Sequence, residues 1–263
     1  MTLKDRAYQL LPPAIVGVFV LVFWEAACRM LKIPSYLFPT PSVVADALWT
    51  GAPSLLYSLW MTVRVTLIAL ALSVVIGALI AFLFVQSPII ERSLFPYAII
   101  LQVTPIVAVA PLIIILVKNT QTALVICATM IAIFPIISNT TIGLRSVDAG
   151  HRNLFAVNQA SRLQNLLYLR IPTALPFFFA GLKVASGLAL IGAVVAEFVA
   201  GTGGRSAGLA FDILQSGIQM EIPRMFAALF LISATGVVLF LVVSAATNLM
   251  LGSWHDSAGQ RET

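Results

Sequence analysis

Charged residues are scarce in this sequence of 263 residues. Asp, Glu, Lys and Arg together make up only 10% of it, whereas a typical soluble domain carries about 25%. Hydrophobic residues make up 60%, and the mean hydropathy is +1.02. So few charges cannot cover a chain of this composition with a polar surface. The shortage of charge therefore excludes a soluble globular protein and indicates a protein embedded in lipid.

Cysteine and histidine are scarce as well. Cys28 and Cys127 both lie in apolar runs, and His151 and His255 are far apart, so we expect no disulfide framework and no metal site. The glycine-rich stretch 201–208, "GTGGRSAG", follows an apolar run and lacks the lysine of a phosphate-binding loop. We expect no catalytic residue and no cofactor on this chain. The net charge of +5 is interpreted as basic cytoplasmic loops rather than nucleic-acid binding.

Long apolar runs dominate what is present. A membrane-spanning helix needs about 20 mainly apolar residues, and the bilayer leaves the backbone no other regular structure than a helix here. Six segments qualify: 11–31, 61–85, 94–117, 122–143, 174–200 and 225–251. The start of the chain is similar to a signal peptide, but Glu25 and the later spans favour an uncleaved first span. We predict an all-α polytopic membrane protein of six transmembrane helices in one domain, 1–263.

The orientation follows from the basic residues in the loops. With the N-terminus inside, more Lys and Arg fall on the inner than on the outer side, which agrees with cytoplasmic N- and C-termini. The proline-rich segment 32–56 is expected to be an ordered loop with a short helix after Thr40. Segments 86–93 and 118–121 are predicted to be tight turns, and 207–218 a short helix.

The segment 148–172 is too polar to span the membrane and lies between the fourth and fifth spans. Its apolar residues recur at spacings of four, three and four, which predicts one amphipathic helix on the inner surface; they are Ala156, Ala160, Leu163 and Leu167. Such a helix either rests on lipid headgroups or docks a soluble partner, and the periodicity does not separate the two.

Two prolines spaced four apart follow this segment. Pro172 is expected to end the amphipathic helix, because the residue before a proline avoids the helical region. Pro176 then falls in the first turn of the next helix, where its missing N–H costs little. The prediction is a stiff corner between the docking helix and the fifth span, able to transmit a push into the membrane.

The stretch 159–201, "QASRLQNLLYLRIPTALPFFFAGLKVASGLALIGAVVAEFVAG", resembles the cytoplasmic signature and fifth span of binding-protein-dependent ABC importer permeases, most closely the nitrate/sulfonate/taurine type. The stretches 58–81, 101–117 and 221–240 are similar to that family too, so the resemblance covers nearly the whole chain. It implies the type I ABC importer permease fold (MetI-like) in a bacterial inner membrane.

The resemblance also implies partners and site residues. The partners would be cytoplasmic ATPase subunits that carry ATP and Mg, a periplasmic or lipoprotein solute-binding protein, and a second permease copy, as a homodimer. The ATPase-coupling residues it implies are Phe155, Ala156, Gln159, Ala160, Ser161, Leu163, Leu167 and Pro172.

The sequence departs from the family signature at Gln159. The family has a glycine there, and its preceding Glu-Ala-Ala becomes Asn153, Leu154 and Phe155, while Ile171 stands in place of a leucine. Because glutamine adopts a left-handed turn less readily than glycine, either the helix continues through Gln159 or the turn forms with other dihedral angles.

Polar residues inside the spans are candidates for the translocation pathway, because burying them in lipid is unfavourable. The candidates are Gln102, Thr104, Asn139, Thr140, Lys183 and Glu197. The two charged residues either line the pathway or extend to the membrane interfaces. The uncharged ones either contact the solute or hold helices together.

The function that these observations favour is the permease subunit of an ATP-driven importer of a small nutrient, such as nitrate, a sulfonate, another organic anion or a small nitrogen heterocycle. A stand-alone channel or secondary transporter is the alternative, although the sequence shows no inverted repeat. An intramembrane enzyme would need a catalytic pair, which the sequence does not offer.

Overall fold

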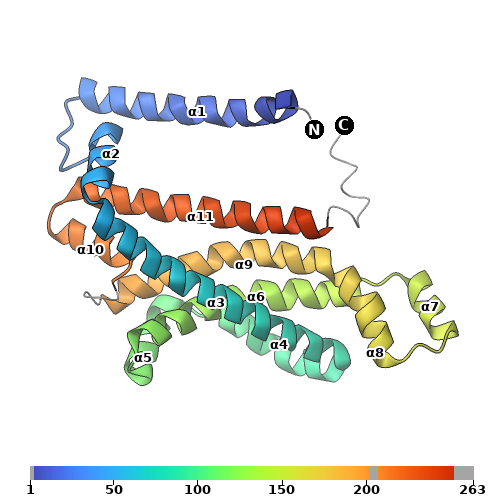
Figure 1. The fold of residues 1–263 in the computed structure, drawn as a ribbon. Helices are drawn as coiled ribbons and strands as arrows, with labels where there is room; N and C mark the ends of the chain where they lie inside the picture. The colour runs from blue at the N-terminus through green and yellow to red at the C-terminus, as the bar shows by residue number, and fades with distance from the viewer. Residues whose placement is uncertain (1–2, 202–206, 252–263) are drawn as a thin grey trace.

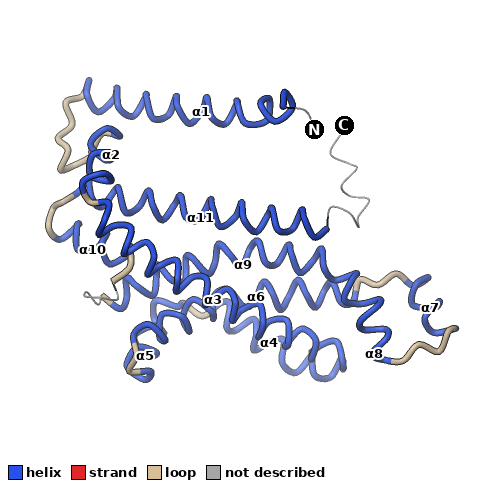
Figure 2. Tube along the Cα trace, in the orientation of Figure 1, coloured by secondary structure: helices blue, strands red, loops and turns tan. Residues whose placement is uncertain are grey.

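The computed structural model describes residues 3–201 and 207–251, and these form helices joined by short connections (Figures 1 and 2). The helices are α1 (Leu3–Met30), α2 (Pro41–Thr50), α3 (Ala52–Gln86), α4 (Pro88–Val103), α5 (Ile106–Val117), α6 (Thr120–Arg145), α7 (Ala149–Val157), α8 (Arg162–Asn165), the π-helix η1 (Leu166–Arg170), α9 (Ile171–Ala200), α10 (Leu209–Ile218) and α11 (Ile222–Leu251).

Five helices are long and apolar enough to cross a membrane, and a bent pair brings the number to six if it counts as one span. The five correspond to the first, second, fourth, fifth and sixth predicted spans. Several run further than predicted: α3 begins at Ala52 rather than at residue 61, because the apolar helix continues into the preceding loop. Both predicted short helices are present as α2 and α10.

The predicted third span, 94–117, is a bent pair of helices in the structure. α4 and α5 meet at an angle of 97°. Thr104 takes an extended conformation directly before Pro105, because the proline ring clashes with a helical residue in front of it. The tight turn predicted for 86–93 is also shorter than expected: Ser87 alone separates α3 from α4, and its hydroxyl accepts the N–H of Ile89.

The centre of the bundle is the contact between α6 and α9. Three glycines allow the two backbones to approach, since a Cβ on Gly143, Gly181 or Gly192 would lie within 2.7–2.8 Å of an atom of the facing helix. Small residues at helix crossings are the usual way to gain packing in lipid, where the hydrophobic effect does not drive helices together. The core of the molecule is therefore built on the fourth and fifth predicted spans.

α1 lies apart from this core. In Figure 1 it runs roughly parallel to α11, with a gap between the two ribbons, and is joined to α2 at its C-terminal end. Just 6% of its apolar stretch is buried. That end is held by an aromatic group in which Trp24 contacts Phe38 and Phe226, with ring centroids 5.3 and 6.1 Å away.

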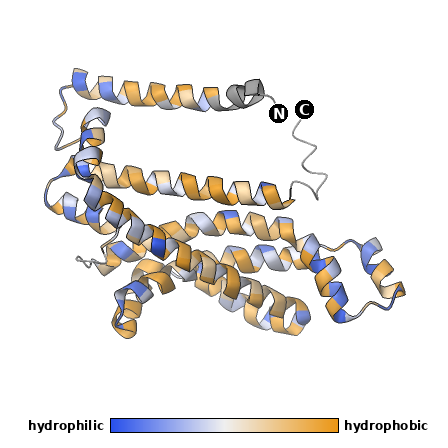
Figure 3. Cartoon of the chain, in the orientation of Figure 1, coloured by the Kyte–Doolittle hydropathy of each residue, from blue (hydrophilic) through white to orange (hydrophobic). Residues whose placement is uncertain are grey.

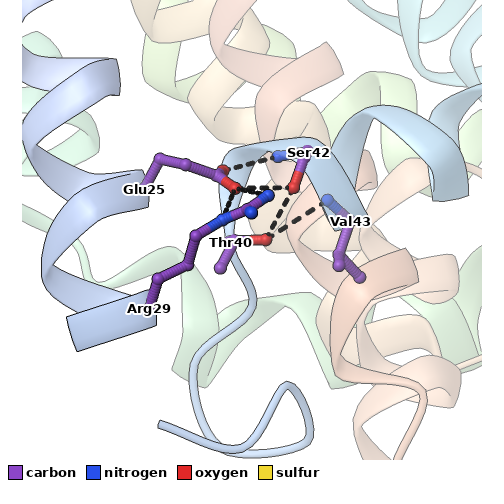
Figure 4. Close-up of polar contacts among 5 residues, drawn as sticks. All are labelled: Glu25, Arg29, Thr40, Ser42 and Val43. Carbon is purple, nitrogen blue, oxygen red and sulfur yellow. Dashed lines mark hydrogen bonds and ion pairs between the residues drawn. The ribbon is translucent and has the colours of Figure 1, made fainter. Parts of the chain in front are cut away.

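A group of hydrogen bonds to the Glu25 carboxylate, between α1 and the start of α2, completes the attachment (Figure 4). The backbone N–H and the hydroxyl of Ser42 donate to the Glu25 carboxylate, at 3.0 and 2.8 Å. Arg29 donates to the same carboxylate at 2.6 Å. The Thr40 hydroxyl caps α2 as predicted by accepting the N–H of Val43. Glu25 therefore satisfies an N–H group at the N-terminus of α2, where a negative charge is favourable.

Candidate functional site: the segment between α6 and α9

The segment from Asp148 to Arg170 projects beyond the end of the bundle (Figure 1). The continuous helix Arg162–Ala200 has 39 residues, about 58 Å at ~1.5 Å per residue, whereas the hydrocarbon core is about 30 Å thick. Its first turns therefore extend past the hydrocarbon region on the side of α7. In Figure 3 this projecting part carries hydrophilic and hydrophobic residues side by side, unlike the more uniformly hydrophobic spans.

The single amphipathic helix predicted for this segment is wrong, because the structure divides it into α7 and α8. α7 ends at Val157, and Gln159 follows in the left-handed region with φ of 51°. Gln159 thus makes the turn that the family signature assigns to glycine, so the departure in sequence leaves the turn in place. Ser161 then begins α8 with a capping box: its hydroxyl accepts the Gln164 N–H, and Gln164 accepts the Ser161 N–H.

Asp148 fixes the start of α7. Its carboxylate accepts the N–H of Gly150 at 2.8 Å. This hydrogen bond, with smaller contributions from His151 and Ala149, lowers the pKa of Asp148 below its usual value. The carboxylate is consequently charged at neutral pH, when it caps the helix best.

Pro172 does not end a helix, as was predicted, although the chain changes direction between α8 and α9 (Figure 1). The backbone passes from α8 through η1 into α9 without a break, and Pro172 occupies the first turn of α9. In η1 the Ile171 N–H bonds to the carbonyl of Leu166, five residues back. This wider turn accommodates a proline that lacks an N–H and would crowd the preceding turn of an α-helix. α8, η1 and α9 are therefore one unbroken helix, which bends where the α8 end leaves the axis of α9 (Figure 1).

One face of α7 and α8 is apolar although it lies outside the spans. Val157 is 82% exposed, Leu163 63% and Leu154 58%, and Leu167 and Tyr168 are exposed too. A cavity of about 320 Å³ opens between the two helices. It is lined by Leu154, Phe155, Asn158, Ala160, Gln164 and Tyr168. Exposed apolar side chains around a hollow are typical of a surface that binds another protein or a membrane.

The structure gathers part of the predicted coupling set around this hollow. Phe155 and Ala160 line it, and Leu163 and Leu167 are exposed on α8 and η1. Ala156 instead faces a different cavity, next to α3. Sequence reasoning missed Leu154, Asn158, Gln164 and Tyr168, although the pattern Ser-x-x-Gln at 161–164 is a recognisable helix start.

Glu197, the acidic pathway candidate, lies inside the fold of this chain. It is 3% exposed, and its carboxylate accepts the Thr62 hydroxyl at 3.0 Å and the Ala210 N–H at 3.2 Å. Thr62 also accepts the N–H of Leu209. Glu197 therefore joins α9 to α3 and α10, and it extends neither to a membrane interface nor to an open surface.

The other pathway candidates are dispersed. Asn139 donates to the Pro135 carbonyl at 2.9 Å, directly where α6 meets α9. Gln102 is exposed at the end of α4, and the Thr104 hydroxyl donates to the carbonyl of Ile100. Lys183 is half-buried on α9 and forms no ion pair with the described residues.

Thr140 lines an open cavity of about 180 Å³ between α3, α6 and α9. Its buried hydroxyl has no hydrogen-bond partner in the described part of the chain. The structure thus gathers neither Thr140 nor the other candidates into one polar channel within a single chain.

These features define an integral membrane protein with a helical core and a projecting segment suited to binding another protein. The chain matches the family described as binding-protein-dependent transport system inner membrane component over residues 73–251. It is 31% identical to the formylaminopyrimidine transport permease protein of Halalkalibacterium halodurans, over 94% of this chain and 97% of that protein. It is 26% identical to the nitrate import permease protein of Leptolyngbya laminosa, over 81% of this chain and 78% of that protein.

A solved structure agrees on the fold. The crystal structure of an amino acid ABC transporter with histidines matches with a TM-score of 0.60 and 21% identity, over 77% of this chain and 95% of that chain. The protein therefore belongs to the family of binding-protein-dependent inner-membrane components, and it is a multi-pass ABC importer permease of the nitrate/sulfonate type. The resemblance in the sequence is confirmed, and so is the type I fold.

Proposed function

We propose that the apolar surface of α7 and α8 docks a cytoplasmic ABC ATPase subunit, and that two copies of this chain form the pathway for a small nutrient. The observation that carries the proposal is the exposure of Leu154, Val157 and Leu163 outside the spans. Burying an apolar side chain is worth about 1.5–3 kcal/mol. A protein partner that covers these residues gains that free energy, which supports docking over a purely structural role for the segment.

The unbroken helix from α8 through η1 to α9 supports coupling. A displacement of α8 passes through η1 directly into α9, which forms the core contact with α6. On this proposal, ATP binding closes the ATPase pair, draws the two docking segments together and turns the pathway outward, and hydrolysis resets it. ATP and Mg belong to the ATPase, and a separate extracytoplasmic solute-binding protein delivers the solute.

The proposed substrate class is a small nitrogen-containing nutrient, a pyrimidine-like heterocycle rather than an inorganic anion. Its support is that the formylaminopyrimidine permease is the more similar of the two transport relatives compared, at 31% against 26% identity for the nitrate permease. Uptake of labelled formylaminopyrimidine, with nitrate as competitor, tests it in cells that express the permease with its ATPase and binding protein. Uptake that nitrate abolishes would reverse the assignment.

The docking proposal is tested by co-purification of the tagged permease with its ATPase in detergent. We expect Leu154→Glu to reduce the retained ATPase at least tenfold, because the new carboxylate would be desolvated in the hollow between α7 and α8. Asn153→Glu is the matched control. It adds the same charge one residue away, on an exposed position outside the hollow where the family signature has glutamate, and we expect it to retain the ATPase.

Two results would contradict docking at this surface. Either Leu154→Glu retains as much ATPase as wild type, or Asn153→Glu loses it equally. Unchanged elution of both variants in size-exclusion chromatography shows that the permease itself is folded. A wild-type permease that binds no ATPase but still transports would favour a stand-alone channel or secondary transporter.

A further inference from the structure

Three arginine side chains line one cavity on the side of the projecting segment that faces the bundle. Arg152 of α7, Arg162 of α8 and Arg170 of η1 surround about 340 Å³. Val85 and Gln86, the last two residues of α3, form the wall toward the membrane. A water molecule occupies about 30 Å³ in the liquid, so the cavity has room for a group much larger than a single water or simple ion.

The charge of this cavity is not balanced by the described residues. No carboxylate lines it, and none of its three arginines forms an ion pair among the side chains that the structure describes, those of 11–201 and 207–251. An adjoining cavity of about 290 Å³ shares Arg152 and Arg170 and adds Arg145, whose partner Glu91 neutralises it. Arginines that converge without a counter-charge repel one another, so an anion bound between them would stabilise the arrangement.

Phosphate is the anion that suits these side chains. The guanidinium group is planar and donates two parallel hydrogen bonds to phosphate oxygens, which makes arginine the preferred residue for phosphate recognition. Asn165 and Gln86 add amide groups to the cavity wall. Val85 and Leu166 add apolar surface beside them. The lining therefore fits a molecule that joins a phosphate to an apolar part.

We propose that this arginine cavity binds the phosphate headgroup of an anionic lipid of the inner leaflet. The cavity begins where α3 ends, which places it at the level of the headgroups. Leu83 and Ile89, on either side of this end in the sequence, are exposed and offer apolar surface to an acyl chain. Basic pockets between helices on the cytoplasmic side of a membrane are suited to such headgroups.

A lipid in this position would connect the docking segment to the bundle. Its phosphate would join α7, α8 and η1, and the lipid itself would lie against the end of α3. The apolar hollow proposed for the ATPase lies between α7 and α8 and shares no lining residue with the arginine cavity. Anionic lipid and ATPase can therefore bind at the same time, and the lipid fixes the orientation of the docking surface.

The test uses the full-length permease in neutral detergent, titrated with phosphatidylglycerol and followed by native mass spectrometry. Phosphatidylcholine serves as the neutral lipid and inorganic phosphate as the free anion. We expect Arg170→Gln to weaken phosphatidylglycerol binding about fivefold, the effect of removing one basic residue from an anionic surface. Arg170→Lys should retain most of the binding. Arg92→Gln is the matched control, since Arg92 is an exposed arginine on α4 outside both cavities.

The outcomes separate the sources of the phosphate. Binding of phosphatidylglycerol that Arg170→Gln weakens and Arg92→Gln does not would support the proposal. Equal binding of phosphatidylcholine, or displacement of the lipid by inorganic phosphate at similar concentrations, would overturn the lipid headgroup as the ligand. Unchanged lipid binding by Arg170→Gln, together with loss of ATPase in co-purification, would also overturn it and assign the arginines to the ATPase interface.

Discussion

Gln159 forms the turn between α7 and α8 with a φ of 51°. A residue with a Cβ in this left-handed region costs about 1–2 kcal/mol relative to the right-handed one. Hydrogen bonds of the next two residues stabilise the turn nevertheless. The Ala160 N–H donates to the carbonyl of Phe155, and Ser161 caps α8. The position needs a left-handed residue rather than a glutamine side chain.

The first prediction concerns this residue. Gln159→Gly should keep the ATPase bound and leave the melting temperature unchanged or slightly raised, since glycine adopts the turn without strain. Gln159→Val should lower the stability of the docking segment by about 1 kcal/mol or more and reduce ATPase retention, because a β-branched residue is least tolerated there. Asn153→Val, inside α7, is the control. Hydrogen exchange of the α7 amides measures the effect, and equal protection in all three variants would contradict it.

Glu197 has a structural role although burying its carboxyl group away from water is unfavourable. Its carboxylate is buried yet receives hydrogen bonds from α3 and α10. Gly208 makes the space for it, since a Cβ there would lie 2.2–2.3 Å from the carboxyl atoms. Nearby, Arg224 on α11 donates to Asp212 at 3.0 Å and to Ser54 at 3.1 Å. These bonds connect the short helix α10 to three spans.

Among the elements, α6 and α9 determine the geometry of the core. Gly181 lies on the backbone of α6: a Cβ there would be 2.7 Å from the Pro135 carbonyl oxygen and 2.9 Å from the Asn139 Cβ. Neither atom belongs to the flexible end of a side chain, so a larger residue must move a whole helix. A Cβ added to Gly187, six residues further along α9, would have no atom within 4 Å.

This contrast gives the second prediction. Gly181→Ala should destabilise the permease by about 1–3 kcal/mol, the range for overpacking a close-packed contact. Gly187→Ala should be neutral or stabilising by up to about 1 kcal/mol, because alanine is the better helix former. Thermal unfolding in detergent compares the two variants with wild type. A Gly181→Ala variant as stable as wild type would show that α6 and α9 separate without penalty.

The elements also show how far the sequence could be interpreted. The apolar runs were sufficient to locate the long spans and Thr40 to locate α2, because hydropathy and capping act locally. Pro105 indicates where the third span could bend but not the angle of 97°, because a proline in an apolar run is compatible with either a kink or a break. The division of 148–172 depended on one dihedral angle, at Gln159, which no periodicity reports.

The candidate site was predicted only in part, because periodicity reports on local structure and not on contacts between distant residues. Periodicity placed Leu163 and Leu167 on the docking segment, and both are exposed there. It could not predict that Ala156 and Ala160 line different cavities, because that depends on the turn between them. Nor could it predict that Glu197 is enclosed by Thr62 and Gly208, residues distant in sequence.

At the scale of the whole molecule, α1 is a separate unit attached at one end. Its apolar stretch is 6% buried, and within that stretch Cys28 is the buried residue, at 3% exposure. The attachment consists of the Trp24 aromatic group and the hydrogen bonds to the Glu25 carboxylate shown in Figure 4. Cys127, by contrast, is fully buried in the α6 core. The two native thiols therefore report on the attachment of α1 and on the core independently.

Removing the hydrogen bonds to the Glu25 carboxylate should detach α1 without unfolding the core. Glu25→Ala deletes the acceptor of the two hydrogen bonds that Ser42 donates from the start of α2 to α1. We expect Cys28 to react severalfold faster with a membrane-permeant maleimide in this variant, while Cys127 stays protected. Glu221→Ala, an exposed carboxylate before α11, should leave both thiols unchanged. If Cys127 reacted as fast as Cys28 in Glu25→Ala, α1 would be part of the cooperative core rather than a helix attached at its end.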